Sequence, residues 1–154
     1  MKHDKETIEK GLKIVSLIGF IMSIIIVVII TFLSLSPSEN LISVSFIPFG
    51  DKGAHMLAYA GLGLFMYFSF VKYSYDRHHK DRDLINSNWL LLPSLFTVIL
   101  GMLLGIIIEL IQIKVDRQFE FLDIVSDGLG LLVGCAIGFY ILKFILKLAI
   151  KRNN

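Results

Sequence analysis

Apolar residues are gathered into four long runs along the chain, and short polar stretches separate them. The runs cover residues 11–35, 54–71, 89–113 and 122–146, and the second is the shortest. A helix needs about 20 predominantly apolar residues to cross the hydrocarbon core of a bilayer. No small-residue cleavage pattern directly follows the first run, which therefore predicts a retained helix rather than a signal peptide. The pattern predicts an all-α integral membrane protein with four transmembrane helices in a compact bundle, as a single domain over residues 1–154.

The composition agrees with a membrane protein and narrows the range of partners. Hydrophobic residues make up 55% of the 154 residues, which is a larger apolar share than a soluble domain of this size can shield from water. The formal net charge of +2 is too small to favour nucleic acid as a partner. Cys135 is the single cysteine and lies inside an apolar run, so the chain forms no internal disulfide.

Basic residues are distributed unequally between the two ends of the predicted helices. Twelve of the 15 lysines and arginines lie in the N-terminal tail, the loop after the second helix and the C-terminal end, and three lie in the other two loops. Lysine and arginine are enriched in the cytoplasmic loops of membrane proteins. The pattern therefore predicts that both termini are cytoplasmic and that the first and third loops face the outside.

Polar residues near the two outer loops fall in three stretches that are far apart in sequence. The predicted topology brings these stretches to the same depth in the membrane. They contain Asp51, Lys52, His55 and Tyr59; Glu109 and Gln112; and Asp116, Arg117, Glu120, Asp123 and Asp127. Each residue alone is also compatible with a helix cap, an ion pair or an interface anchor. Together they predict a functional polar pocket that opens outward, because helix packing requires no such collection of titratable groups.

Spacing by four residues places these polar groups above glycines on single helix faces. The stripes contain Asp51, His55, Tyr59 and Gly63; Gly101, Gly105 and Glu109; and Asp123, Asp127, Gly130, Gly134 and Gly138. Small residues at every fourth position let membrane helices approach closely, since no side chain holds the backbones apart. The glycine faces are therefore predicted to be helix contacts.

Three segments of the chain resemble the signature blocks of VanZ-like membrane proteins. They are DKGAHMLAYAGLG, ELIQ and RQFEFLDIVSDGLGLLVG, which lie within residues 51–134. The family pattern is D-K-x-x-H-x-x-x-Y, then E-x-x-Q, then R followed by D-x-x-x-N-x-x-G. The matching positions are Asp51, Lys52, His55, Tyr59, Glu109, Gln112, Arg117, Asp123 and Gly130. The chain departs from the pattern at Asp127, where the family has asparagine, so a negative charge can stand in place of an amide.

The resemblance implies a bacterial cell-envelope protein, since the family takes its name from a protein linked to resistance to the lipoglycopeptide teicoplanin. We expect a multi-pass protein of the bacterial plasma membrane whose extracytoplasmic pocket binds an envelope lipid head group, a lipid-linked envelope precursor or a lipoglycopeptide. Lys52 and Arg117 would bind phosphate or carboxylate groups, which suit the donor fork of arginine. The expected binding residues are Asp51, Lys52, Tyr59, Gln112, Arg117 and Asp127.

A membrane enzyme that acts on a phosphate- or glycan-bearing lipid is the alternative function. In this hypothesis His55 is the acid, base or nucleophile, and Glu109 or Asp123 orients it. Arg117 would stabilise charge that develops in the transition state. We expect His55 and Glu109 to act as a pair within a common outward-facing cavity.

The sequence contains no compact metal-ligand motif, glycine-rich phosphate loop or nucleophile elbow. We therefore assign no metal and no cofactor from the sequence. A divalent ion is a variant of the enzyme hypothesis, because carboxylates are suitable ligands for such ions. Its ligands would be Asp51, Glu109, Asp123 and Asp127.

Overall fold

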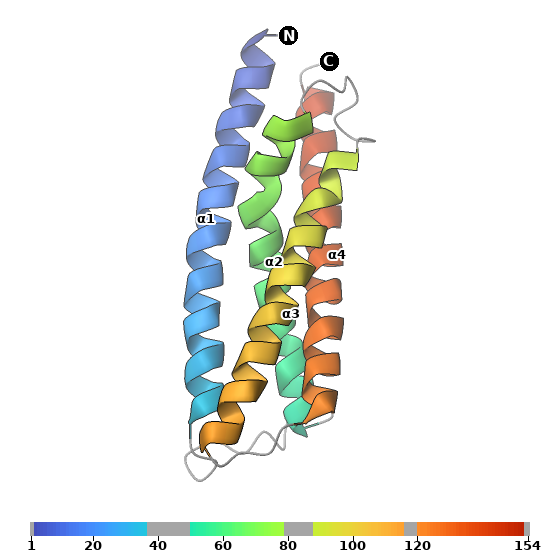
Figure 1. The fold of residues 1–154 in the computed structure, drawn as a ribbon. Coiled ribbons are helices and arrows are strands. Elements are labelled where there is room, and N and C mark those ends of the chain that lie inside the picture. Colours follow the sequence, from blue (N-terminus) through green and yellow to red (C-terminus); the bar gives the residue numbers. More distant parts are fainter. Residues whose placement is uncertain (1, 37–49, 79–87, 116–119, 153–154) are drawn as a thin grey trace.

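Four helices dominate the part of the chain that the computed structural model describes, which is residues 2–36, 50–78, 88–115 and 120–152 (Figure 1). They are α1 at Lys2–Leu35, α2 at Gly50–His78, α3 at Leu92–Gln112 and α4 at Phe121–Arg152, with 3-10 turns η2 at Asn88–Leu90 and η3 at Ile113–Val115. Segments long and apolar enough to cross a membrane are Glu6–Leu35, Gly50–Arg77, Asn88–Gln112 and Phe121–Ala149. The prediction of an all-α protein with four membrane-length helices is confirmed for these residues.

The helices extend further than the apolar runs that predicted them. α2 covers residues 50–78 rather than 54–71, and α1 begins at Lys2 rather than at residue 11. Polar residues in these extensions remain compatible with a helix, and the Lys10 Nζ lies 2.9 Å from the Glu6 Oε1 one turn away. Hydropathy therefore marks the part of each helix that suits lipid, whereas the helical backbone continues beyond it. Asp51 and Lys52 therefore lie in the first turn of α2, on the helix that also carries His55.

Local sequence explains where two of the helices begin. α2 begins at Gly50, whose φ of 58° lies in the left-handed region that glycine adopts without a steric penalty. α3 has Pro93 in its first turn, where the missing N–H breaks no helical hydrogen bond. The third apolar run therefore divides into η2 and α3 instead of forming one helix.

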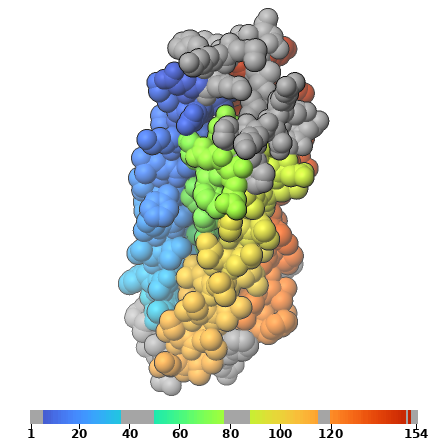
Figure 2. Space-filling view, turned by 45° about the horizontal axis from the view of Figure 1, so that its top comes forward, coloured from blue at the N-terminus to red at the C-terminus, as the bar shows by residue number. Residues whose placement is uncertain are grey.

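α2 is the central helix of the bundle. It contacts α1, α3 and α4, and α3 also contacts α4. Figure 2 shows that α2 reaches the surface near the end of the bundle where α1 begins, and that α3 lies over it further along. The start of α1 and the end of α4 lie at the same end of the bundle (Figure 1). The first turns of α2 and α4 and the last turn of α3 therefore meet at the opposite end.

The outer surface of the bundle is rich in apolar side chains, and its interior contains polar ones. Phe20, Leu103 and Phe144 are each more than half exposed, whereas Glu109 and Asp127 are 1% and 2% exposed. Large exposed apolar surfaces and buried carboxylates are both unusual for a soluble monomer. Lipid can cover such an outer surface, so the pattern supports a multi-pass membrane protein.

Close contact between the backbones of α2 and α4 depends on glycine. A Cβ added at Gly63 would lie 2.7 Å from the carbonyl oxygen of Leu131, and one added at Gly134 would overlap the backbone of Ala60 and Leu64. No side chain fits at either point, so the helices approach each other backbone to backbone. This geometry confirms that these glycine stripes lie at a helix contact.

α1 packs against α2 through small residues as well. A Cβ at Gly19 would lie 2.7 Å from the carbonyl oxygen of Phe65. The hydroxyl of Ser16 donates a hydrogen bond to the Phe68 carbonyl over 3.0 Å and accepts one from the Lys72 N–H over 2.9 Å. The spacing of glycines in the sequence does not single out this contact, because α1 contributes one glycine to it rather than a stripe.

Buried polar groups in the half of the bundle that holds the termini bind mainly to the backbone. The Tyr67 hydroxyl donates to the carbonyl oxygen of Leu90 over 2.9 Å, and the Ser74 hydroxyl donates to the carbonyl of Trp89. These bonds attach η2 to α2 and require no ionised group. The opposite end of the bundle differs, because its buried polar groups include the carboxyl groups of Glu109, Asp123 and Asp127.

Candidate functional site

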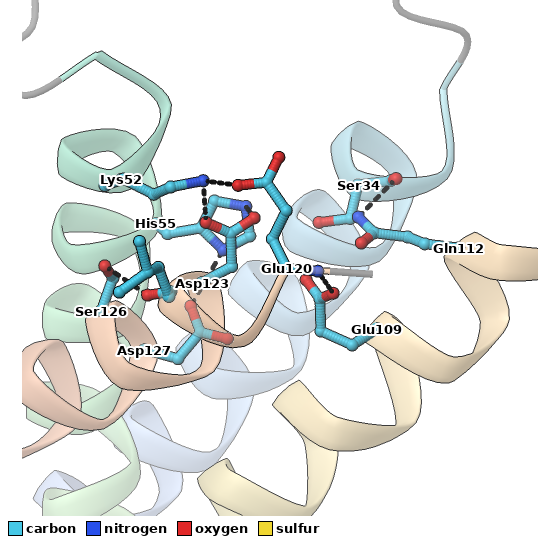
Figure 3. Close-up of polar contacts among 10 residues, drawn as sticks. Ser34, Lys52, His55, Glu109, Gln112, Glu120, Asp123, Ser126 and Asp127 are labelled. Atoms are coloured by element: carbon cyan, nitrogen blue, oxygen red, sulfur yellow. Dashed lines mark hydrogen bonds and ion pairs between the residues drawn. The ribbon is translucent and has the colours of Figure 1, made fainter. Parts of the chain in front are cut away.

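Polar side chains from three helices converge at the end of the bundle opposite the termini (Figure 3). Lys52 and His55 come from the start of α2, and Asp123 and Asp127 come from the first turns of α4. Glu109 lies near the end of α3. This convergence follows from the up-and-down order of the helices, because α2 and α4 begin where α3 ends.

The imidazole of His55, on α2, contacts side chains from two successive turns of α4. Its Nδ1 is 3.0 Å from the Asp127 Oδ1, and its Nε2 is 3.8 Å from the Asp123 Oδ2. The three side chains are 12%, 2% and 7% exposed in the order His55, Asp127 and Asp123. The contact with Asp127 holds the orientation of the imidazole ring. When the ring is protonated, each of its two N–H groups faces a carboxylate.

Lys52 is paired with two carboxylates. Its Nζ lies 2.7 Å from the Asp123 Oδ1 and also pairs with the Glu120 Oε2. The side chains of Lys52 and Glu120 are 29% and 48% exposed, so this part of the site is accessible from outside the bundle. An anionic ligand would have to compete with these carboxylates for the ammonium group.

Glu109 connects α3 to the start of α4. Its Oε2 accepts a hydrogen bond of 3.1 Å from the Glu120 N–H, which immediately precedes α4. The side chain is 1% exposed, and its Oε1 has no hydrogen-bond partner among the described residues. One carboxylate oxygen of Glu109 therefore holds the start of α4. The other oxygen is buried and can accept a hydrogen bond from a ligand.

Tyr59 and Asp127 share a space that Gly105 leaves open. A Cβ added at Gly105 would lie 2.8 Å from the Asp127 Oδ2 and 3.4 Å from the Tyr59 hydroxyl oxygen. Tyr59 is 1% exposed, and within the described part of the chain its hydroxyl makes no hydrogen bond of good geometry. The glycine below the site therefore makes room for polar atoms as well as for helix packing.

The structure brings most of the predicted site residues into one cluster, which we call the polar cluster. Its members are Asp51, Lys52, His55, Tyr59, Glu109, Glu120, Asp123 and Asp127. Gln112 is near but faces α1, because its Nε2 donates to the Ser34 carbonyl over 3.0 Å. Arg117 lies outside the described residues.

Two features of the polar cluster differ from the sequence-based expectation. The shorter contact of His55 is with Asp127, which was expected as a binding residue only; of the two residues expected to orient it, Glu109 or Asp123, Asp123 lies 3.8 Å from its Nε2. Glu120 was given no binding or catalytic role, yet it links Lys52 to Glu109 through its side chain and its N–H. The spacing of three residues between Glu120 and Asp123 was the available signal, since it places both beside the first turn of α4.

Negative groups outnumber positive ones in the described part of the polar cluster. Five carboxylates surround one lysine and one histidine. Buried carboxylates with too few partners carry a large desolvation cost. The arrangement is therefore suited to ligand groups that donate hydrogen bonds or carry positive charge, and to proton exchange at His55.

Comparison of the chain with protein-family models, with curated proteins and with solved structures finds no match. The described residues contain four helices that are long and apolar enough to cross a membrane, as in a multi-pass membrane protein, with a buried titratable cluster at one end of the bundle.

Proposed function

We propose that the chain is a VanZ-like protein of the bacterial plasma membrane with both termini in the cytoplasm. Its polar cluster would open to the extracytoplasmic side and bind an envelope lipid head group, a lipid-linked envelope precursor or a lipoglycopeptide, and so contribute to teicoplanin-type resistance. The observation that supports this proposal most is the burial of titratable groups from three helices at one end of the bundle.

The depth of the polar cluster favours a ligand that resides at the membrane surface. A carboxylate at the bilayer centre costs about 2.5–3.5 kcal/mol on insertion scales, and this cost falls toward the interface. Asp51 and Asp123 lie in the first turns of their helices, close to where the head groups of lipids would be. Ionisable groups inside membrane segments usually serve a function, because stability alone selects against them.

The contacts indicate how a head group would be recognised. Buried carboxylates of Glu109 and Asp127 can accept hydrogen bonds from ligand hydroxyl or amine groups. Lys52 can bind a phosphate if Glu120, which is about half exposed, moves aside. The proposed ligand is therefore a polar head group with both donors and an anionic group, as lipid-linked envelope precursors and lipoglycopeptides have.

Catalysis is the second candidate function, and the His55–Asp127 pair favours it. A carboxylate 3.0 Å from the Nδ1 of His55 would hold the ring so that the other nitrogen can exchange a proton with a substrate. Asp123, 3.8 Å from that second nitrogen, could then stabilise the protonated ring. The substrate would be a lipid bearing a phosphate or a glycan.

Titration of the protein in lipid nanodiscs with teicoplanin or a short-chain lipid-linked precursor distinguishes these functions. We expect saturable binding of at least one ligand, weakened by about 10- to 100-fold in Glu109→Gln, since the Oε1 of Glu109 is a buried acceptor and a hydrogen bond to a charged group contributes about 1.5–3 kcal/mol. Lys72→Gln, which removes a lysine that lies in the last turns of α2 and pairs with Glu9, is the matched control and should bind normally.

Chemical analysis of the recovered ligand completes this test. Unchanged ligand supports a binding protein, whereas a product that forms with the wild-type chain and not with His55→Gln supports the enzyme. Failure of every ligand to bind, or equal binding by wild type and Glu109→Gln, would contradict the proposed binding function.

A further inference from the structure

We propose that Asp51, His55 and Asp123 bind one divalent transition-metal ion of the zinc or manganese type. One ligand atom from each of these side chains lies within 4.8 Å of the others. Asp51 and His55 are four residues apart on α2 and therefore share a helix face, while Asp123 approaches from α4. This metal site goes beyond the proposed function and does not depend on it.

The donor set and its geometry suit such an ion. Histidine nitrogen and carboxylate oxygen are ordinary zinc ligands at about 2.0–2.2 Å, so two ligands of one ion lie at most about 4.4 Å apart. The distance from the His55 Nε2 to the Asp123 Oδ2 is 3.8 Å, which already falls within this limit. Three protein ligands would leave a coordination position open for water or a ligand, as in catalytic zinc sites.

Asp127 provides the outer contact that metal-binding histidines usually have. Its Oδ1 lies 3.0 Å from the His55 Nδ1, which leaves the Nε2 to face Asp123. A carboxylate in this position fixes the ring and increases the basicity of the nitrogen that binds the metal. At 2% exposure, Asp127 has little access to water and is well suited to this supporting role.

An independent observation comes from α3. The Oε1 of Glu109 is buried and has no hydrogen-bond partner in the described part of the chain. Glu109 interacts electrostatically with Asp123, His55 and Asp127, and Figure 3 shows its carboxylate on the side of α3 that faces these residues. A buried carboxylate oxygen without a partner is costly. Water bound to a metal ion would supply the missing hydrogen-bond donor.

The pairing of Lys52 with Asp123 is compatible with a bound ion. Lys52 approaches the Oδ1 of Asp123, so the Oδ2 remains on the side of His55. One ammonium group does not balance the five carboxylates of the polar cluster in the described residues. A divalent cation would reduce this excess of negative charge.

Metal binding by the purified full-length chain tests the inference without any lipid ligand. The protein, carrying a tag without histidine, is stripped with a chelator and titrated with Zn²⁺ and with Mn²⁺ in competition with a fluorescent indicator. We expect about one ion per chain and a rise in melting temperature on binding. Asp51→Asn and Asp123→Asn should each weaken binding by more than about tenfold, and Asp127→Asn by about 10- to 100-fold.

Matched variants make the result decisive. Asp51 is exposed, so Asp51→Asn should fold even if a buried variant does not. The double variant His78→Gln/His79→Gln removes two histidines that are not among the proposed ligands and should bind the ion normally. Binding of neither ion, or binding that survives Asp51→Asn and is lost in the His78/His79 variant, would overturn the proposed site. Since lipid is not present, this outcome would leave the proposed head-group binding to be judged by its own titration.

Discussion

Replacing Gly134 with alanine is expected to destabilise the bundle strongly. The added Cβ would overlap the backbone of Ala60 and Leu64 on α2, and backbone atoms cannot rotate away as a flexible side chain can. The helices would have to separate along their closest contact. Overpacking of a dense interior typically costs about 1–3 kcal/mol and occasionally more, and here the affected contact joins α4 to the central helix.

Gly61→Ala is the matched control for Gly134→Ala. A Cβ at Gly61 would meet one atom, the Cδ1 of Ile26 at 3.8 Å, which is an ordinary contact. Alanine also favours helix over glycine by about 1 kcal/mol, so this variant should be as stable as the wild type or slightly more stable. Thermal unfolding in detergent, followed by circular dichroism, compares the two variants. Equal melting temperatures for Gly134→Ala and the wild type would mean that α2 and α4 are not in backbone contact.

The His55–Asp127 pair is expected to couple strongly in stability. His55→Leu leaves the Asp127 carboxylate, 2% exposed, without its partner, and Asp127→Leu leaves the ring of His55 with one carboxylate at 3.8 Å. Breaking a buried ion pair by removing one member costs about 3–5 kcal/mol, whereas replacing both members with apolar residues is often nearly neutral. The double variant His55→Leu/Asp127→Leu should therefore be more stable than the single variant His55→Leu, in which Asp127 stays buried without its partner.

A double-mutant cycle measures this coupling from the free energies of unfolding of the four proteins. The exposed pair of Glu6 and Lys10 is the control, since side chains that are 64% and 73% exposed should couple by no more than about 0.5 kcal/mol. Additive effects of His55→Leu and Asp127→Leu would mean that the two side chains do not form a buried pair in the membrane protein.

The number of helices and the location of the polar cluster could be predicted from sequence because both depend on simple periodicity. Apolar length predicts each span, and a spacing of four residues places Asp51, His55 and Tyr59 on one face of α2. Successive helices run in opposite directions across the membrane. The start of α2 therefore lies at the same end of the bundle as Glu109, near the end of α3. These relations require no knowledge of how the helices contact one another.

The pairing within the cluster could not be predicted in this way. Asp123 and Asp127 are one helical turn apart, about 6 Å along the axis of α4. A shift of α4 by that amount would exchange the partner of His55, and the sequence does not specify the offset between helices. The offset depends on close contacts such as that of Gly63 with Leu131, whose position becomes known only from the packed structure.

The helices extend beyond the apolar runs that predicted them for a related reason. Lys72 and Asp76 form an ion pair one turn apart in the polar end of α2, which continues as helix beyond the apolar run. Hydropathy measures how favourably side chains transfer into lipid. Helix formation depends on backbone hydrogen bonds, which polar residues can also form.

The proposal that the polar cluster faces the outside of the cell is central to the function, and cysteine accessibility tests it most directly. Single cysteines are placed by Lys114→Cys, near the cluster, and by Lys151→Cys, near the end of α4; both lysines are exposed. Cys135→Ser supplies the background, and Cys135 itself is buried. An impermeant thiol reagent applied to intact cells should label the cysteine at position 114 and should label the one at 151 only after permeabilisation. Labelling of position 151 and not 114 in intact cells would place the cluster in the cytoplasm and contradict the proposed function.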